Sequence, residues 1–178
     1  MFMFGMKKTE LRLLPHDPTW KTDFTAEKNR IISTLQNPSV QIEHIGSTSI
    51  PTVHAKPILD IAILCHQKTF EPLVQTLIEL GYDYRGKYED EKTHFYAVLE
   101  KDKIRYCQAH IYTEPDSDFY CKLHFRNILS QNLELAREYD EYKLSLAKTV
   151  SNKSEYAEIK SRWVDDFIVK VMEVEVEE

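Results

Sequence analysis

A glycine-serine turn carries the most recognisable chemistry in this chain. Residues 43–51 read EHIGSTSIP, and Gly46, Ser47, Thr48 and Ser49 form the predicted turn. A glycine lets a ligand approach the backbone closely, and the turn offers backbone N–H groups and hydroxyls to phosphate oxygens. Most turns of this composition only reverse the chain direction, so the turn alone is weak evidence for a phosphate site.

Asp60 strengthens that interpretation because it lies within an apolar segment, ILDIAILC, at residues 58–65. An unpaired charge is costly to bury, so this carboxylate needs a partner. It can bind Mg²⁺ or Mn²⁺ beside the phosphates, or it can cap local backbone or pair with Lys56. A site for two metal ions commonly uses a second carboxylate two residues further on, but here that position is Ala62.

Five further side chains are candidates for the same site. His110, near the end of a predicted strand, is expected to approach Asp60 as a metal ligand or base, or to make a structural hydrogen bond. Glu43 and His44 precede the turn. Glu43 can support the metal site, and His44 can orient the turn or only bond locally. Lys56 and Arg126 can neutralise phosphate charge.

Glu27 is an acidic residue on an otherwise apolar helical stripe. A helix is predicted to open at Asp17-Pro18, and its apolar positions recur at helical spacing at Trp20, Phe24, Ile31 and Leu35. Glu27 either lies at the edge of this stripe and reaches water or is held inward by a polar partner. In the second case it belongs, with Glu43 and His44, to the groups that surround the candidate site.

The order of the predicted elements indicates an α+β fold with a mixed sheet flanked by helices and a helical C-terminal part. Strands are predicted at residues 40–45, 58–65, 82–88, 94–100 and 104–113, and helices at 17–37, 70–80, from 117, at 133–149 and at 152–171. We expect a single domain over residues 1–178, with a sheet-containing core at about 13–115 and the helical part at about 116–172.

Composition limits the classes of partner. The net charge of −6 disfavours an extended nucleic-acid surface but leaves room for a small anionic ligand in a locally positive pocket. Apolar runs are too short to cross a membrane, and the N-terminal apolar residues precede the lysines, the reverse of a secretory signal. The three cysteines lack CxxC spacing. We therefore expect a cytoplasmic protein, and the oligomeric state stays open.

Several motifs together resemble the GrpB family. EHIGSTSIP and AKPILDI resemble its signature, and further matching segments run from about residue 13 to 168: LPHDPTW, AHIYTEPDSDF, LHFRNIL, AREYDEYKLSLA and YAEIKSRWVDDFI. The resemblance implies the fold of the polymerase-beta-type nucleotidyltransferases. In that superfamily a Gly-Ser turn is followed, about a dozen residues later, by a strand with two alternating acidic residues, of which Asp60 corresponds to the first.

Two functional hypotheses follow from this resemblance. In the first, the protein is a nucleotidyltransferase: Gly46 and Ser47 hold phosphates, Asp60 binds a metal ion with His110 or Glu43, and Lys56 and Arg126 offset charge on the phosphates. In the second, the protein is a binding module for a nucleotide or another phosphorylated small molecule and has lost catalysis. Ala62, where the superfamily has its second carboxylate, favours the second hypothesis.

Overall fold

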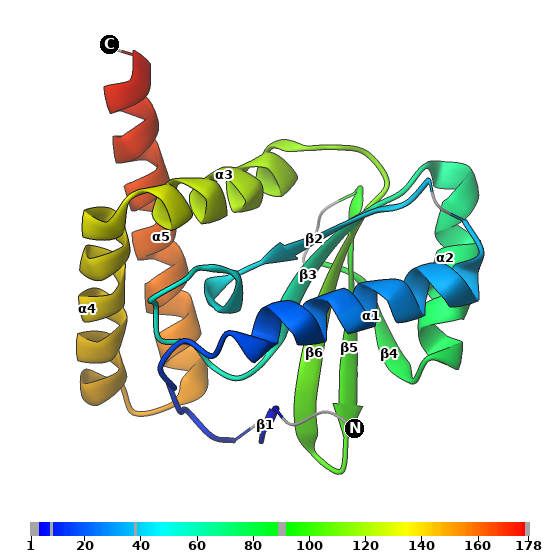
Figure 1. The fold of residues 1–178 in the computed structure, drawn as a ribbon, viewed down its shortest axis with the longest axis horizontal. Coiled ribbons are helices and arrows are strands. Elements are labelled where there is room, and N and C mark those ends of the chain that lie inside the picture. The colour runs from blue at the N-terminus through cyan, green and yellow to red at the C-terminus, as the bar shows by residue number, and fades with distance from the viewer. Residues whose placement is uncertain (1–3, 8, 38, 89–91, 177–178) are drawn as a thin grey trace.

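A mixed β-sheet forms the centre of the protein, with helices on both of its faces (Figure 1). The computed structural model describes residues 4–7, 9–37, 39–88 and 92–176. The strands are β1 (Met6–Lys7), β2 (Gln41–Ile45), β3 (Leu59–Leu64), β4 (Tyr82–Lys87), β5 (His94–Lys101) and β6 (Ile104–Tyr112). The helices are α1 (Thr19–Leu35), α2 (Gln67–Glu79), α3 (Ser117–Gln131), α4 (Leu133–Thr149) and α5 (Lys153–Val176), and a 3-10 turn, η1, spans Ser47–Ser49.

The strand order within the described residues is β2-β3-β6-β5-β4, with β1 added on β6. β3 and β6 are parallel, whereas β2–β3, β6–β5 and β5–β4 are antiparallel. The register places Ile45 opposite Asp60, and Asp60 opposite Gln108. Because partner residues in adjacent strands point to the same face, Asp60, Gln108 and His110 share one face of the sheet.

The opposite face carries the main apolar core. Alternate residues of β3 and β6, among them Leu59, Ile61 and Ala109, are fully buried there against α1 and α2. Trp20 and Ile31 reach this core from α1, and residues of α2 at helical spacing, such as Leu73 and Leu77, complete it. This packing fixes the sheet from behind and leaves the Asp60 face to contact other elements.

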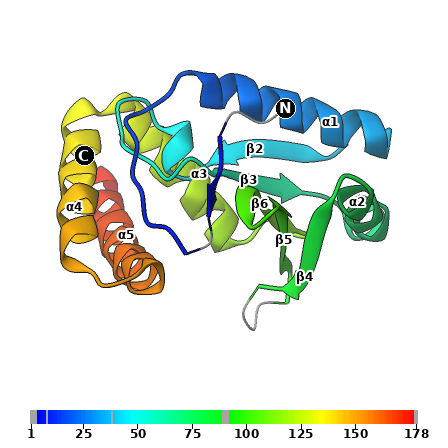
Figure 2. The same cartoon turned by 90° about the horizontal axis from the view of Figure 1, so that it is seen from below.

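The helices α3, α4 and α5 gather at one end of the sheet, away from α2 (Figures 1 and 2). They form a second apolar cluster with the connection that follows η1, in which Ile50 and Val53 contact Phe125, Tyr139 and Phe167. The connection itself is held by backbone hydrogen bonds between Leu14 and Ala55, at 2.8 and 2.9 Å. The C-terminal helices are thereby joined to the same loop that carries the Gly-Ser turn.

The α+β prediction is confirmed, with the mixed sheet and the flanking helices in the expected chain order. Local details differ, and α5 runs to Val176 instead of ending at residue 171. α1 begins at Thr19 rather than at Pro18, and the Asp17 carboxylate accepts the Thr19 N–H at 2.9 Å. α2 begins at Gln67 instead of Phe70, because its polar first turn carries no apolar stripe. β1 was not predicted, since two residues are too short to show an alternating pattern.

Within the described part of the chain, every helix is too short or too polar to cross a membrane.

Candidate functional site

Gly46 and Asp60 are in direct contact where β2 leads into η1. Gly46 has φ 69° and ψ −176°, a backbone conformation that is essentially restricted to glycine. A β-carbon on Gly46 would lie 2.5 Å from Asp60 Oδ2 and 2.9 Å from Asp60 Cβ. Glycine is therefore required at this position for two reasons: the backbone angles disfavour any other residue, and the Asp60 carboxylate leaves no room for a β-carbon.

Asp60 is also held by a chain of side chains from β6. Gln108 donates its amide N–H to Asp60 Oδ1 at 2.5 Å, and Arg105 Nη1 donates to the Gln108 amide oxygen at 2.9 Å. Burial raises the pKa of Asp60, although Gln108 and nearby lysines oppose that shift. Asp60 is thus oriented by a neutral amide and has no direct ion pair among the described residues.

A cleft of about 580 Å³ opens above this face of the sheet. It is bounded by the Gly46-Ser47 bend, by β3, β5 and β6, and by α3, α4 and α5. Ser47, Asp60 and His110, which the sequence analysis assigned to one site, all line it. Gly46, Thr48 and Lys56 line it too, so six of the predicted site residues meet at a common cavity.

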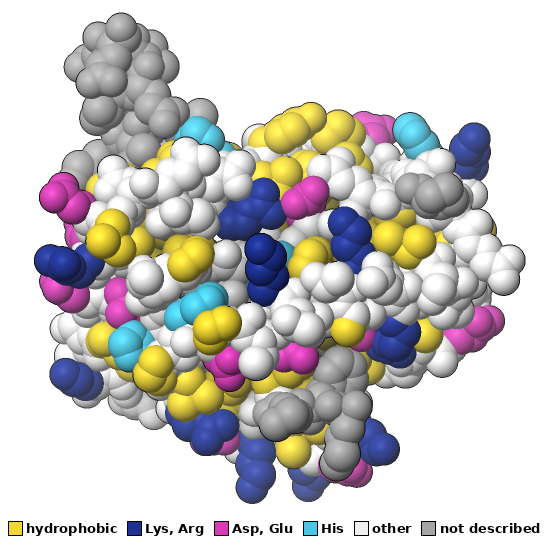
Figure 3. All heavy atoms as spheres, in the orientation of Figure 1, with side chains coloured by type: hydrophobic (Ala, Val, Ile, Leu, Met, Phe, Trp, Pro, Cys, Tyr) yellow, Lys and Arg dark blue, Asp and Glu magenta, His cyan; other side chains and the backbone are white. Residues whose placement is uncertain are grey.

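Basic side chains dominate the charge of the cleft. Among the described residues, six basic side chains line it against three carboxylates, a formal surplus of three positive charges in a protein whose net charge is −6. The basic residues are Lys56, Arg105, Lys122, Lys143, Lys153 and Lys160, and the carboxylates are Asp60, Asp118 and Asp165. On the face in Figure 3 basic and acidic side chains are interspersed. The lining of the cleft therefore concentrates positive charge in an acidic protein.

Tyr139 connects the bend to the C-terminal helices. Its hydroxyl lies 3.0 Å from Ser47 Oγ, and it also interacts with Lys160 of α5. The Tyr139 phenol, and further Asp60, raise the pKa of Lys160, which therefore carries its charge at neutral pH. One tyrosine on α4 thus links the hydroxyl of the bend to an ammonium group that faces the sheet.

Two other lysines of the cleft have a pKa near neutral pH. Burial, and then the nearby Lys160 and Lys153, lower the pKa of Lys56 to about 7, while its ammonium lies 4.4 Å from the centre of the Tyr156 ring. Burial also lowers the pKa of Lys143 to about 7, against the attraction of Asp140. Lys143 is 1% exposed and donates to the His54 carbonyl. An anion entering the cleft would favour the protonated form of both groups.

His110 lies opposite Ala62, two residues beyond the Asp60–Gln108 pair, and its ring bonds to His94 instead of Asp60. Its Nδ1 lies 2.9 Å from His94 Nε2, and His94 Nδ1 lies 3.4 Å from Asp118 Oδ2. Burial lowers the pKa of His110 well below its usual value and that of His94 to about 4, so both rings are neutral at pH 7. The register puts Gln108, rather than His110, beside Asp60.

Five predicted residues lie outside the lining of the cleft, as far as the structure describes it. Glu27 is 2% exposed and lies on the core side of the sheet, bonded to Arg30 and Tyr82, so it is held inward as the second alternative proposed. Arg126 pairs with Glu43 at 2.9 Å and donates to the His44 carbonyl. These ion pairs satisfy the charges and keep them away from the cleft.

The remaining two position the turn from behind. His44 points to the core side, where it stacks on Phe24 and its Nε2 lies 2.9 Å from Thr48 Oγ1. Burial lowers the pKa of His44 to about 4. Ser49 uses its hydroxyl within the turn, donating to the Gly46 carbonyl at 2.6 Å. His44 and Ser49 therefore shape the bend, and neither presents its side chain to a ligand in the cleft.

The residues at Asp60 do not fit the expected centre for Mg²⁺ or Mn²⁺. Ala62 supplies no ligand, Gln108 directs an amide donor at Asp60 Oδ1, and Asp118 already accepts from Tyr112 and Lys122. In the described residues no three His, Cys, Asp or Glu side chains are grouped so that they could hold a metal ion. A centre for two divalent ions, which needs several carboxylates, has no ligand set here.

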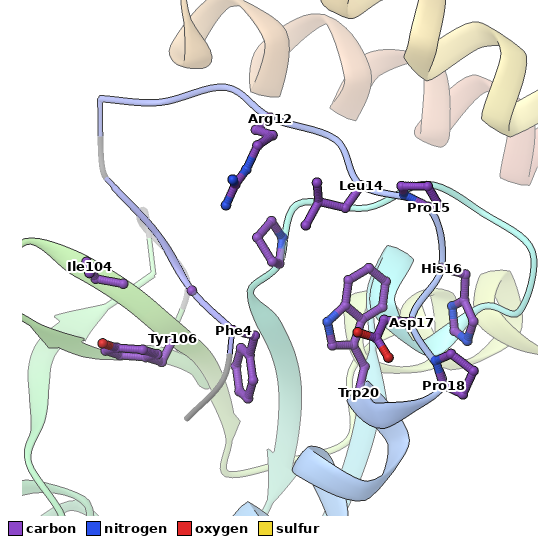
Figure 4. A pocket seen from close by; sticks show the side chains of 12 residues that line it. Phe4, Arg12, Leu14, Pro15, His16, Asp17, Pro18, Trp20, Ile104 and Tyr106 are labelled. Atoms are coloured by element: carbon purple, nitrogen blue, oxygen red, sulfur yellow. The ribbon is translucent and has the colours of Figure 1, made fainter. Parts of the chain in front are cut away.

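A second cavity, of about 610 Å³, lies beside the N-terminal segment (Figure 4). Its walls are mainly aromatic and proline side chains, including Phe4, Trp20 and Tyr106, with Arg12 and Asp17 as its charged groups. None of the predicted site residues lines it within the described chain. Within the described residues its lining contains no serine, threonine or lysine, in contrast to the cleft.

Comparison with known proteins agrees with these structural features. The family model described as "GrpB protein" matches residues 10–170. The chain belongs to the GrpB family. A UPF0157 protein of Halalkalibacterium halodurans is 32% identical over 160 residues, which cover 89% of this chain and 80% of the relative. The resemblance noted in the sequence is confirmed.

Solved structures support the fold. The conserved protein GrpB from Enterococcus faecalis superimposes with a TM-score of 0.76 at 24% identity, covering 90% of this chain and 99% of that one. The Cid1 poly(U) polymerase with bound MgGTP gives a TM-score of 0.51 at 14% identity, covering 75% of this chain and 43% of the polymerase. The chain described here therefore has the nucleotidyltransferase fold. At these identities the likeness extends to the fold alone.

Several residues of the cleft escaped the sequence analysis. Gln108 is adjacent to Asp60 only through the parallel pairing of β3 with β6. Tyr139, Lys143 and Lys160 come from helices whose tertiary placement a single sequence does not reveal. Their helical spacing offered one usable signal: Lys143 and Tyr139 are four residues apart and Lys160 follows Tyr156 by four, so each pair shares a helix face.

Proposed function

We propose that this GrpB protein binds a nucleotide or another phosphorylated small molecule in the lysine-lined cleft. The observation that carries the proposal is the concentration of positive charge around the Gly46-Ser47 bend in an acidic protein. A cleft lined by one sign of charge attracts ligands of the opposite sign. The cavity of about 580 Å³ lies in the size range of small-molecule sites.

A buried hydrogen-bond donor without an acceptor among the described residues supports the same ligand class. Arg105 lines the cleft, and its buried Nε–H has no acceptor among the described residues. Buried donors are rarely left unpaired, so an additional acceptor is expected when the site is occupied. Phosphate offers several acceptor oxygens with negative charge, and guanidinium and ammonium groups are its usual partners in proteins.

A thermal-shift screen tests the proposal. Purified protein is heated with nucleoside triphosphates and with simple sugar phosphates, each with a chelator and with excess Mg²⁺. A ligand at 100 times its dissociation constant adds about 2.7 kcal/mol, which raises the melting temperature of a protein of this size by about 5–10 °C. No shift with any phosphorylated compound in either condition would contradict the proposal.

A pair of serine variants localises the binding. Ser47→Ala removes the hydroxyl that lines the cleft and contacts Tyr139. Ser33→Ala removes an exposed hydroxyl on α1, whose partner is a backbone carbonyl. The ligand-induced shift is expected to shrink in Ser47→Ala and to stay unchanged in Ser33→Ala. Equal shifts in both variants would place the ligand elsewhere.

Mg²⁺- or Mn²⁺-dependent nucleotidyl transfer is the second candidate function. The fold shared with a poly(U) polymerase that binds MgGTP favours it, as does the contact between Asp60 and the Gly-Ser bend. The ligand set around Asp60 opposes it, because Ala62 replaces the second carboxylate. The screen separates the two, since a transferase of this type requires a divalent ion for productive binding of its nucleotide.

A further inference from the structure

We propose that the lysines of the cleft replace the divalent cation, so that the ligand is a polyphosphate such as a nucleoside triphosphate bound in its metal-free form. This inference rests on the proposed function and specifies the ligand of the same site. Proteins with this fold commonly carry metal-binding carboxylates, whereas this chain has Ala62 two residues after Asp60 and no second carboxylate there.

The ammonium groups surround the place where metal-binding carboxylates would act. Lys56, Lys122 and Lys160 come from the loop before β3, from α3 and from α5, and all three interact electrostatically with Asp60. They approach Asp60 from separate elements, so their convergence is set by the tertiary fold. Lys56 and Lys160 can each contribute a positive charge and N–H donors to phosphate oxygens, whereas Lys122 is already paired with Asp118.

The charge of the cleft suits a ligand with more than one phosphate. A monophosphate carries a charge of about −1.5 to −2 at neutral pH. The formal surplus of three positive charges, which the cleft has once Lys56 and Lys143 are protonated, exceeds that charge. A triphosphate carries more charge and can reach more of the basic groups. Bound Mg²⁺ would cancel part of that negative charge and add repulsion from the lysines. We therefore expect Mg²⁺ to weaken binding.

Asp60 has a different role in this arrangement. Its Oδ2 packs against Gly46, and its Oδ1 accepts the Gln108 amide, so the carboxylate supports the bend from below. A carboxylate next to phosphate is repulsive unless a metal ion bridges the two. Replacing Asp60 with its isosteric amide should therefore preserve or strengthen metal-free binding, whereas a metal-bridged site would lose its affinity.

The test is a titration of ATP and of inorganic triphosphate by calorimetry, once with EDTA and once with excess Mg²⁺. We expect binding in EDTA that is as tight as in Mg²⁺ or tighter. Binding that requires Mg²⁺ would overturn this inference and leave the proposed function standing. Absence of binding in both conditions, with every phosphorylated probe, would overturn both.

Variants assign the binding to the lysines. Lys160→Met and Lys56→Met keep most of the side-chain volume and remove a charge, and each should weaken metal-free triphosphate binding about 10- to 100-fold. Lys68→Met, an exposed position on α2, is the matched control and should leave binding unchanged. Asp60→Asn should bind as well as the parent protein or better. A loss of binding in folded Asp60→Asn, or equal affinities for the cleft variants and the control, would contradict the inference.

Discussion

Glu27 and Asp60 are carboxylates enclosed on opposite sides of the same sheet, and the protein satisfies them in different ways. Glu27 receives N–H donors from Arg30 at 2.5 and 2.9 Å and the Tyr82 hydroxyl at 2.6 Å. Asp60 receives a neutral amide at 2.5 Å and has lysines around it that make no direct ion pair with it in the described structure. Glu27 is fully occupied by the fold, whereas Asp60 faces a cavity.

This difference separates a charge that the fold pairs directly from one that lies at the wall of the candidate site. A carboxylate that is paired on the core side is satisfied by the fold, and removal of one partner of such a pair destabilises the protein. A carboxylate whose pKa is raised by burial, beside a cleft with surplus cations, is where functional sites are commonly found. The two sides of the sheet can therefore be tested separately, because changes to one should leave the other unaffected.

The largest effect is expected for Glu27→Leu. The substitution removes the Glu27 acceptor from the buried Tyr82 hydroxyl and from the Arg30 guanidinium, which keeps its bond to the Leu80 carbonyl. The free energy of unfolding should therefore fall by about 3–5 kcal/mol. Urea denaturation measures the loss. The exposed Glu71→Leu on α2 serves as control and should change stability by less than about 0.5 kcal/mol. The nucleotide affinity of the folded Glu27→Leu protein should be unchanged. A loss of affinity in folded protein would show that the core face of the sheet, with Glu27, contributes to binding in the cleft.

A smaller loss is expected for Gly46→Ala, which tests the contact between the bend and Asp60. The new β-carbon meets Asp60 Oδ2 at 2.5 Å in a backbone region that disfavours side chains, so stability should fall by about 2–3 kcal/mol. Gly86→Ala is the control, because Gly86 also has a positive φ, of 79°, but its β-carbon would meet nothing within 4 Å. Equal losses for the two variants, measured by thermal or urea unfolding, would show that the Asp60 contact adds nothing to the backbone strain.

The smallest effect is a gain in stability for Asp60→Asn at neutral pH. Because burial raises the pKa of Asp60, the folded protein binds this proton more tightly than the unfolded chain does. Stability contributed by Asp60 therefore decreases as pH rises from the unfolded pKa through the folded one. The amide variant should melt higher than the parent protein at pH 7, and the difference should disappear at a pH below both values.

Glu27→Gln provides the contrast for that experiment. It removes the ion pair with Arg30 on the core side and should lower the melting temperature at pH 7. If Asp60→Asn also lowered it at pH 7, the ionised form of Asp60 would be stabilised by the lysines after all, and Asp60 would belong with Glu27 as a structural charge.

Sequence reasoning went furthest where the signal was local. The alternation and apolar runs of β3 and β6, the helical stripe of α1 and the Gly-Ser bend could all be located before the structure was known. The grouping of Ser47, Asp60 and His110 at one cavity also followed, because it depends on the ends of neighbouring strands. The family resemblance supplied the topology that local patterns alone do not contain.

Residues whose roles depend on tertiary pairing were misplaced or missed. Arg126 was assigned to the ligand because it can neutralise phosphate charge, yet Glu43 from another element pairs with it. Lys160 looks like an ordinary helical surface residue until α5 packs near Asp60. The spacing of residues along a helix defines its faces, but it does not say which face meets a distant strand.

A crystal structure of the protein soaked with a nucleoside triphosphate in the presence of EDTA would be the most direct measurement. We expect the phosphates between the Gly46-Ser47 bend and the ammonium groups of Lys56 and Lys160, with no ion bridging them to Asp60. Phosphates located outside this cleft, or an empty cleft at saturating nucleotide, would contradict a phosphate-binding role for it.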